Sequence, residues 1–391
     1  MERFDVIVVG AGPAGSTAAR ECAARGLATL LLDKDAFPRD KPCGGGVNVR
    51  AAALLPFDLA PVVERAISAI RFTVRQGAGF TRTSAQPLTY MTQRRRLDAY
   101  LVERAVASGA TLRDGTPVRG VDRRPSHVLV RTDRRAYEGR SLVVADGANG
   151  PTARLAGLST RHRMGVGLEG NVTPASAVPP DWQQTMGLDL GDVPEGYGWL
   201  FPKGDHVNIG VAGFGPVGTL LRGRLVRLTA SYGYDPKRLW GLRGFRLPMR
   251  AGGTTLASGN VLAVGDAAGL LDPITGEGIY AAIWSGRAAA YHLAAYLSGD
   301  AGDLRGYEQE VRANLFPQLD VAERWHDVSQ LSQATFARLI ERSPRAWNLV
   351  CRILRGEDTY AGFSRRHRGV AGFVTVLSRL RRLRPGFATA D

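Results

Sequence analysis

The chain has 391 residues, a net charge of +15 and 44% hydrophobic residues. This length and composition predict a globular protein of two or three packed units and exclude a low-complexity or disordered chain. Only four of the 51 basic residues are lysines, an arginine bias that indicates a GC-rich genome rather than a nucleic-acid partner.

Cysteine and histidine usage points to a reducing compartment without a metal site. Cys22, Cys43 and Cys351 are too few and too scattered for a disulfide framework, and the six histidines show no metal-ligand spacing. We see no signal peptide and no stretch long and apolar enough to span a bilayer. We therefore expect a cytoplasmic protein, and attraction to an anionic membrane surface stays open.

The first elements occur in the order that a dinucleotide site requires. Residues 4–9 predict a buried strand, a Gly-Ala-Gly-Pro-Ala-Gly turn follows at 10–15, and a helix is expected to about residue 25. A second apolar strand at 28–32 ends in an acid. The glycines admit a pyrophosphate to the helix N-terminus, and the acid accepts hydrogen bonds from an adenosine ribose. The predicted dinucleotide-binding residues are Gly10, Gly12, Ala14, Gly15 and Asp33.

Residues 38–46 read Pro-Arg-Asp-Lys-Pro-Cys-Gly-Gly-Gly. Three glycines after Cys43 let the backbone lie flat against a planar ligand, whereas the alternative is a flexible turn with a buried cysteine. The spacing resembles a motif of the geranylgeranyl reductase family of FAD flavoproteins, in which this loop lies against the flavin ring. The resemblance implies that Cys43, Gly44 and Gly45 contact FAD.

Two further stretches resemble the same family. A helix is expected from 93 to about 108, and its Arg94 matches a flavin-contacting arginine in an Arg-x-x-Phe-Asp pattern, although Leu97 replaces the phenylalanine. Short strands at 111–112 and 117–118 resemble the adenine side of such a fold, which implies a cofactor contact for Val118. The Asp146-Gly147 pair resembles a stretch shared by para-hydroxybenzoate-hydroxylase-like flavoproteins.

Short strands and Pro- or Gly-rich turns from about 165 to 248 predict an inserted antiparallel sheet. Within it, Tyr-Gly-Trp-Leu-Phe-Pro at 197–202 matches the family's Tyr-x-Trp-x-Phe-Pro motif. The two-residue period of a strand places Tyr197, Trp199 and Phe201 on one face. Such a face is ordinarily sheet core, but the family match favours a substrate wall.

A second strand-to-helix junction follows the inserted sheet. An apolar strand at 261–264 stops at Gly265 and Asp266, and an Ala-rich helix is expected from near Gly276 to about 297. A helix N-terminus beside a carboxylate suits a polar or anionic ligand such as reduced flavin, whose ribityl hydroxyls would donate to Asp266. The alternative is an ordinary turn. The resemblance implies that Asp266, Gly276, Gly278 and Ile279 contact FAD.

The remainder, from about 303, is expected to be helical. Basic stretches at 365–368 and 379–384 flank an apolar-rich stretch at 370–377. Such a segment suits a bilayer surface, and the alternative is a solvated face of a terminal helix.

The predicted fold is α/β, with a Rossmann-type, glutathione-reductase-like FAD-binding domain and an inserted antiparallel-sheet substrate domain. We assign 1–70, 94–160 and 250–300 to the FAD-binding domain, 71–93 and 161–249 to the substrate domain, and 301–391 to a C-terminal helical region. The resemblance implies an FAD-dependent reductase that saturates double bonds of a polyprenyl chain on a lipid, quinone or chlorophyll-type substrate. The electron donor is NADPH, ferredoxin or a reduced quinone.

Two other functions stay open: a hydroxylase- or halogenase-like monooxygenase of the same superfamily, and a non-catalytic flavin-bound lipid carrier. For a reductase, an isolated alkene needs a proton as well as a hydride, so positive charge grows on carbon. The faces of Tyr197 and Trp199 would stabilise that charge by roughly 0.5–2 kcal/mol each. A free thiol is mostly protonated at neutral pH, which makes Cys43 the candidate acid.

Overall fold

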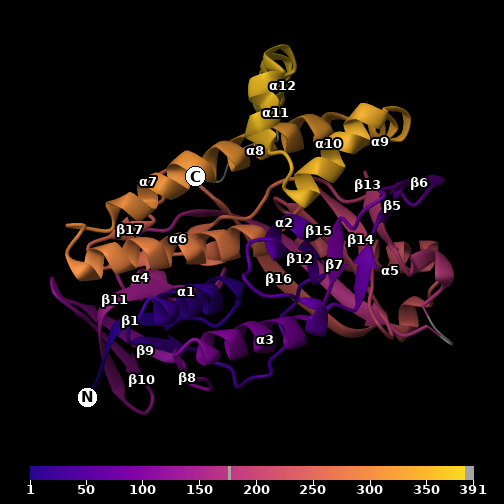
Figure 1. The fold of residues 1–391 in the computed structure, drawn as a ribbon. Coiled ribbons are helices and arrows are strands. Elements are labelled where there is room, and N and C mark those ends of the chain that lie inside the picture. Colours follow the sequence, from indigo (N-terminus) through magenta and orange to yellow (C-terminus); the bar gives the residue numbers. More distant parts are fainter. Residues whose placement is uncertain (175–177, 384–391) are drawn as a thin grey trace.

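A computed structural model describes residues 1–174 and 178–383 (Figure 1). Its first sheet is built on parallel strands in the order β18, β11, β1, β2 and β8. These strands are β1 (Glu2–Val9), β2 (Thr29–Leu32), β8 (Thr111–Arg113), β11 (Ala136–Val144) and β18 (Val261–Ala263). An antiparallel extension adds β9 (Val118–Arg123), β10 (Val128–Thr132) and β17 (Ala257–Ser258).

The apolar runs of β1 and β2 are buried because this sheet is covered on both faces. Side chains of α1 (Pro13–Ala24), α3 (Arg94–Ala107) and α6 (Ile279–Ser298) share one core with the strands and with the β9–β10 hairpin. Figure 1 shows α6 lying beside α1. The two helices approach closely at Gly286, where a Cβ would lie 2.5 Å from the carbonyl oxygen of Ala14.

The second sheet has the order β16, β12, β15, β14, β13, β5 and β6. Its strands are β5 (Ala69–Val74), β6 (Gly79–Thr83), β12 (His162–Val172), β13 (Thr185–Leu190), β14 (Gly196–Pro202), β15 (Val207–Phe214) and β16 (Trp240–Arg250). The pairing is antiparallel, as predicted, except that β5 and β13 run parallel. Helix α5 (Gly218–Ser231) packs on β12 and β15 and buries Leu221, Leu225 and Leu228 against this sheet.

The apolar content of residues from about 51 to 70 predicts a helix, and the structure shows this prediction to be wrong. Pro56 and Pro61 fall inside that range, and proline interrupts a helix. The chain instead forms α2 (Val49–Ala52), the 3₁₀ turn η1 (Ala60–Val62) and β4 (Arg65–Ile67) before entering β5. A small sheet joins β4 and β3 (Gly46–Asn48) to β7 (Thr89–Met91). It crosses the assigned boundary at residue 70, and the domain division remains a proposal.

The C-terminal helices are α7 (Arg305–Asn314), α8 (Phe316–Leu331), α9 (Gln333–Arg342), α10 (Pro344–Arg355), α11 (Tyr360–Arg366) and α12 (Arg368–Arg382). Figure 1 places α11 and α12 at the outer side of the molecule, beyond α8. Among residues 1–174 and 178–383, no helix is both long enough and apolar enough to cross a membrane. Shorter elements are α4 (Thr152–Leu155), η2 (Pro180–Trp182), η3 (Pro236–Arg238) and η4 (Gly265–Ala268).

Helix α12 packs on α8 through one face. Ser378 donates to the Asp327 carboxylate at 2.7 Å, and Arg381 and Arg382 donate to the same carboxylate at 3.0 and 2.7 Å. Two arginines of the predicted basic stretch therefore hold the helix in place. Arg384 of that stretch lies outside the described residues.

Candidate active site

The carboxyl ends of the parallel strands meet at one edge of the first sheet, and the predicted dinucleotide turn lies there. Gly10 follows β1 with a φ of 101°, and a Cβ on it would lie 2.3 Å from the carbonyl oxygen of Ala145. A Cβ on Gly15 would lie 1.8 Å from the carbonyl oxygen of Gly10. Both glycines are therefore required by close packing of the turn itself.

Gly12 is different because the space in front of it is open. A Cβ there would approach only the guanidinium nitrogens of Arg39 and Arg94, at 3.8 and 3.9 Å. Helix α1 begins at Pro13, so its unpaired first-turn N–H groups lie at the same place. Two arginines and a helix N-terminus are the donors that a pyrophosphate needs, and the residues present fit that part of FAD.

The two arginines are fixed by carboxylates. Asp33, at the end of β2, is buried and accepts a hydrogen bond from the Ala11 N–H at 2.7 Å. Arg39 donates to Asp98 at 2.9 Å and lies 3.5 Å from Asp33. Arg94 binds Asp98 through two hydrogen bonds of 2.7 Å. Asp98 thus orients both guanidinium groups beside the glycine turn.

Val118 begins β9, shortly after a segment that contacts Asp33. The Thr116 N–H donates to the Asp33 carbonyl oxygen at 2.7 Å, which holds this segment beside β2. Val118 is partly buried and packs against the first-sheet core. Its predicted contact with the adenine side of FAD remains a prediction.

Asp266 lies in η4, immediately after β18. Its Oδ1 atom is 3.0 Å from the position that a Cβ of Gly278 would occupy, and its Oδ2 atom is 3.6 Å from Lys41 Nζ. Gly278 caps α6, which starts at Ile279 rather than near Gly276 as predicted. The second junction therefore brings a carboxylate to the start of α6, where the dipole is positive.

The loop before α6 also touches the second sheet. Gly276 has a φ of 65°, and a Cβ on it would lie 3.0 Å from the Tyr197 hydroxyl. That hydroxyl donates a hydrogen bond to the Thr275 carbonyl oxygen. Burial raises the pKa of Tyr197, so its phenol stays protonated at neutral pH.

The Cys43 loop, residues 43–46, lies against the second sheet. The Cys43 N–H donates to the Glu169 carboxylate on β12 at 2.8 Å. Within the loop, the Gly45 N–H donates to Cys43 Sγ at 3.4 Å. Gly45 has a φ of 69°, and a Cβ on it would lie 2.1 Å from the Thr92 carbonyl oxygen. The glycine sequence is therefore a steric requirement of the loop.

Lys203, just after β14, anchors the same loop. Its ammonium group donates to the carbonyl oxygens of Gly44 and Thr92, at 2.6 and 2.9 Å. The Thr92 N–H donates to the Gly45 carbonyl oxygen at 2.8 Å. Burial lowers the pKa of Lys203 to about 8.

Tyr197, Trp199 and Phe201 share one face of β14, as the two-residue period predicts. The ring centroids of Tyr197 and Trp199 are 6.1 Å apart, as are those of Trp199 and Phe201. A Cβ on Gly44 would lie 2.7 Å from the Phe201 ring and 3.2 Å from Trp199 Nε1. The aromatic face is thus closed directly against the Cys43 loop.

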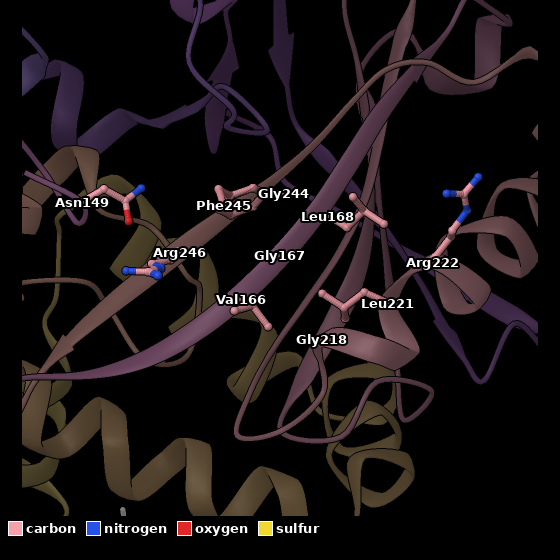
Figure 2. Close-up of a pocket in the computed structure, with 10 residues that line it drawn as sticks. All are labelled: Asn149, Val166, Gly167, Leu168, Gly218, Leu221, Arg222, Gly244, Phe245 and Arg246. Carbon is pink, nitrogen blue, oxygen red and sulfur yellow. The ribbon is translucent and has the colours of Figure 1, made fainter. Parts of the chain in front are cut away.

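A shallow hollow of about 670 Å³ lies elsewhere (Figure 2). Val166 and Leu168 of β12 line it together with Leu221 of α5. Because side chains alternate along a strand, Leu168 points to the opposite face from its neighbour Glu169. Leu168 therefore lies on the α5 side of the sheet, whereas Phe245, which also lines the hollow, has its ring centroid 6.4 Å from that of Trp199.

Glu169, Lys203 and Arg39 belong to the site but were not predicted from the sequence. Glu169 and Lys203 contact the Cys43 loop across 126 and 159 positions of sequence, respectively. One local signal existed for Lys203, which directly follows the aromatic motif.

Comparisons with known proteins agree with this geometry. An FAD binding domain family matches residues 3–189. The chain is 34% identical to a menaquinone reductase of Mycolicibacterium smegmatis, over 74% of this chain and 76% of that protein. It is 31% identical to a geranylgeranyl diphosphate reductase of Rhodobacter capsulatus, over 78% of each.

Solved structures share the fold. A geranylgeranyl bacteriochlorophyll reductase-like protein of Thermoplasma acidophilum has a TM-score of 0.77 at 24% identity, over 90% of this chain and 96% of that one. A flavin-dependent brominase has a TM-score of 0.76 at 18% identity, over 96% of this chain and all of the other. The fold and the glycine turn define an FAD-dependent oxidoreductase. The chain belongs to the geranylgeranyl reductase family of these flavoproteins.

Proposed function

We propose that the protein reduces isolated C=C bonds in the polyprenyl chain of a lipid, quinone or chlorophyll-type substrate. The observation that carries this proposal is the closure of the aromatic face against the Cys43 loop, through Gly44 and Phe201. The named activities of the menaquinone and geranylgeranyl diphosphate reductases support it. Bound FAD supplies the hydride.

The chain's own residues bind the tail and manage charge. An apolar wall of Tyr197, Trp199 and Phe201 suits an isoprenoid, since burying apolar surface contributes about 25 cal/mol per Å². Positive charge that grows on a tertiary carbon is stabilised by the aromatic faces. The proton comes from an acid beside the aromatic face, and the sequence pattern makes the Cys43 thiol one candidate.

A monooxygenase is the alternative, because the fold is shared with a flavin-dependent brominase. The two reactions differ in their need for oxygen. A third function is lipid carriage, in which the protein would bind the tail at the same aromatic face but would not reduce it.

The test uses purified holoenzyme, reduced anaerobically with dithionite so that the natural electron donor is not needed. Geranylgeranyl diphosphate and menaquinone with an unsaturated tail are the substrates, and the product is followed by mass spectrometry. We expect a gain of two hydrogens per reduced bond without oxygen. A product that carries oxygen and forms only in air would establish the monooxygenase. An unchanged tail would contradict the reductase, and retention of the lipid by the protein would then favour the carrier.

We also propose that α12 rests on an anionic lipid surface. Val370, Phe373, Val376, Leu380 and Leu383 form an exposed stripe along this helix, with Phe373 at 65% and Leu383 at 80% exposure. Exposed arginines flank it at 365, 368 and 379. Apolar side chains bordered by cations match the interface of an acidic membrane, where a polyprenyl substrate resides.

A further inference from the structure

Glu169 on β12 has one carboxyl oxygen that the protein leaves without a partner. The residue is 7% exposed, and its Oε1 atom accepts the Cys43 N–H. Among the described residues, its buried Oε2 atom has no hydrogen-bond partner. Burying a polar atom without a partner costs free energy, so this oxygen is expected to serve a ligand.

The register of the second sheet places this carboxyl beside Trp199. Glu169 pairs with Gly210 on β15, and Gly210 pairs with Trp199 on β14. Directly paired residues project to the same face, so Glu169 and Trp199 share the aromatic face. A Cβ on Gly210 would lie 2.0 Å from the Trp199 ring, which shows that the indole covers the glycine. Nothing larger than hydrogen at position 210 separates the two side chains.

Burial keeps part of the Glu169 population protonated near neutral pH. Burial raises the pKa of Glu169 to about 7 and Asp40 adds to this, while the Cys43 N–H, Lys203 and Arg94 oppose it. Arg243 is directly paired with Glu169 on β16, but its guanidinium forms an ion pair with Asp40 at 3.0 Å. The charged or titratable groups that face Glu169 are therefore Asp40, Cys43, Arg94, Lys203 and Arg243.

The Cys43 sulfur is engaged within its own loop, where it accepts a hydrogen bond from the Gly45 N–H. Glu169 is buried on the aromatic face, can hold a proton near neutral pH, and has one carboxyl oxygen without a hydrogen-bond partner among the described residues. We propose that Glu169 is the acid that protonates the alkene, an inference that rests on the proposed reductase function.

The proposed step balances without a further reactant. The O–H bond of Glu169 breaks, and the π electrons of the alkene form a C–H bond at one carbon. The hydride adds with its electron pair to the other carbon. Glu169 is left as a carboxylate, which takes a proton from water before the next turnover.

The test compares Glu169→Gln with Cys43→Ala in FAD-loaded protein. Glutamine keeps an oxygen for the Cys43 N–H but has no acidic proton. Infrared difference titration of the oxidised proteins, without substrate, follows the C=O band of a protonated carboxyl. We expect a band that titrates near pH 7 in the wild type and in Cys43→Ala and that is missing from Glu169→Gln.

The second readout is single-turnover saturation of geranylgeranyl diphosphate or menaquinone by dithionite-reduced protein, per bound FAD. We expect Glu169→Gln to be slower by about 10²- to 10⁴-fold, the usual contribution of a general acid. Cys43→Ala, which alters the loop beside the proposed cofactor site, should lose less turnover per bound FAD than Glu169→Gln. Wild-type turnover should fall as pH rises through about 7, as expected if Glu169 must be protonated.

Three results would overturn the assignment of Glu169: no titrating band in the wild type, undiminished turnover by Glu169→Gln, or a selective loss in Cys43→Ala that returns the acid role to the thiol. A wild-type protein that saturates neither substrate would overturn the reductase function, and the acid role with it. That outcome is distinct from one in which the wild type saturates a substrate and Glu169→Gln does so equally well.

Discussion

The Tyr197 hydroxyl on β14 donates a hydrogen bond to the Thr275 carbonyl oxygen in the loop before α6. The two residues are 78 positions apart, and their contact joins the aromatic face to the second junction. Asp266 and Gly278 lie at that junction, so one hydrogen bond connects the proposed substrate wall to the proposed cofactor loop.

Tyr197→Phe removes this hydrogen bond and keeps the ring. We expect a loss of about 1 kcal/mol in the free energy of unfolding, measured by urea denaturation, together with weaker FAD binding. Tyr234→Phe is the matched control, because no described residue is a hydrogen-bond partner of the buried Tyr234 hydroxyl. Equal effects of the two substitutions would show that the Thr275 contact contributes nothing specific.

Gly12→Ala separates cofactor binding from folding. The added methyl group meets only ordinary contacts at 3.8 and 3.9 Å, so the apoprotein should keep its thermal stability. It occupies the space proposed for the pyrophosphate, and FAD affinity measured by fluorescence quenching should fall at least tenfold, about 1.4 kcal/mol.

Gly15→Ala provides the contrast. Its methyl group would lie 1.8 Å from a backbone oxygen, so it should destabilise the apoprotein itself. Unchanged FAD affinity in Gly12→Ala would place the pyrophosphate elsewhere.

Lys203→Met tests the anchor of the Cys43 loop. It leaves the carbonyl oxygens of Gly44 and Thr92 without their donor, and we expect lower stability and lower FAD affinity. The exposed Lys237→Met is the control and should behave as wild type.

The stability of the wild type relative to Lys203→Met should also depend on pH. Burial lowers the pKa of Lys203 from 10.5 to about 8. Between these values the unfolded chain binds a proton that the folded chain does not. The relative stability should therefore rise as pH increases from about 8 to 10.5, and this gain should be lost as pH falls through 8. A flat difference across that range would contradict a buried, depressed lysine.

The stripe on α12 predicts lipid binding. Replacing Phe373 and Leu380 together by aspartate should abolish sedimentation with vesicles that contain phosphatidylserine, because both side chains are exposed and apolar. Added salt should weaken wild-type binding. The matched control replaces Leu220 and Val226, exposed apolar residues of α5, by aspartate. Loss of binding in the control as well would assign the effect to net charge.

Local sequence patterns predicted those features that are determined by residues close together in the sequence. The turn at Gly10–Gly15, the acid at Asp33 and the alternating face of Tyr197, Trp199 and Phe201 each follow from spacing over a few residues. The wrong helix over 51–70 came from apolar content that outweighed Pro56 and Pro61.

The contacts that Glu169 and Lys203 make with the Cys43 loop were not predictable from local patterns. Glu169 reaches Cys43 across 126 positions of sequence, because the fold brings β12 to the Cys43 loop. Lys203 donates to backbone oxygens, which have no sequence signature. Such contacts depend on tertiary packing, so a single sequence gives no periodicity by which to find them.

The insertion of the second sheet has a consequence for biosynthesis. Leu142–Val144 of β11 pair with β18, which begins 117 residues after Val144. A chain emerging from the ribosome therefore presents an unpaired, apolar strand edge until residue 263 has been made. The surface of α1 that contacts Gly286 stays uncovered until α6 has also been synthesised. Fragments that end before α6 should therefore aggregate or recruit chaperones, and the protein becomes competent to retain FAD only late in its synthesis.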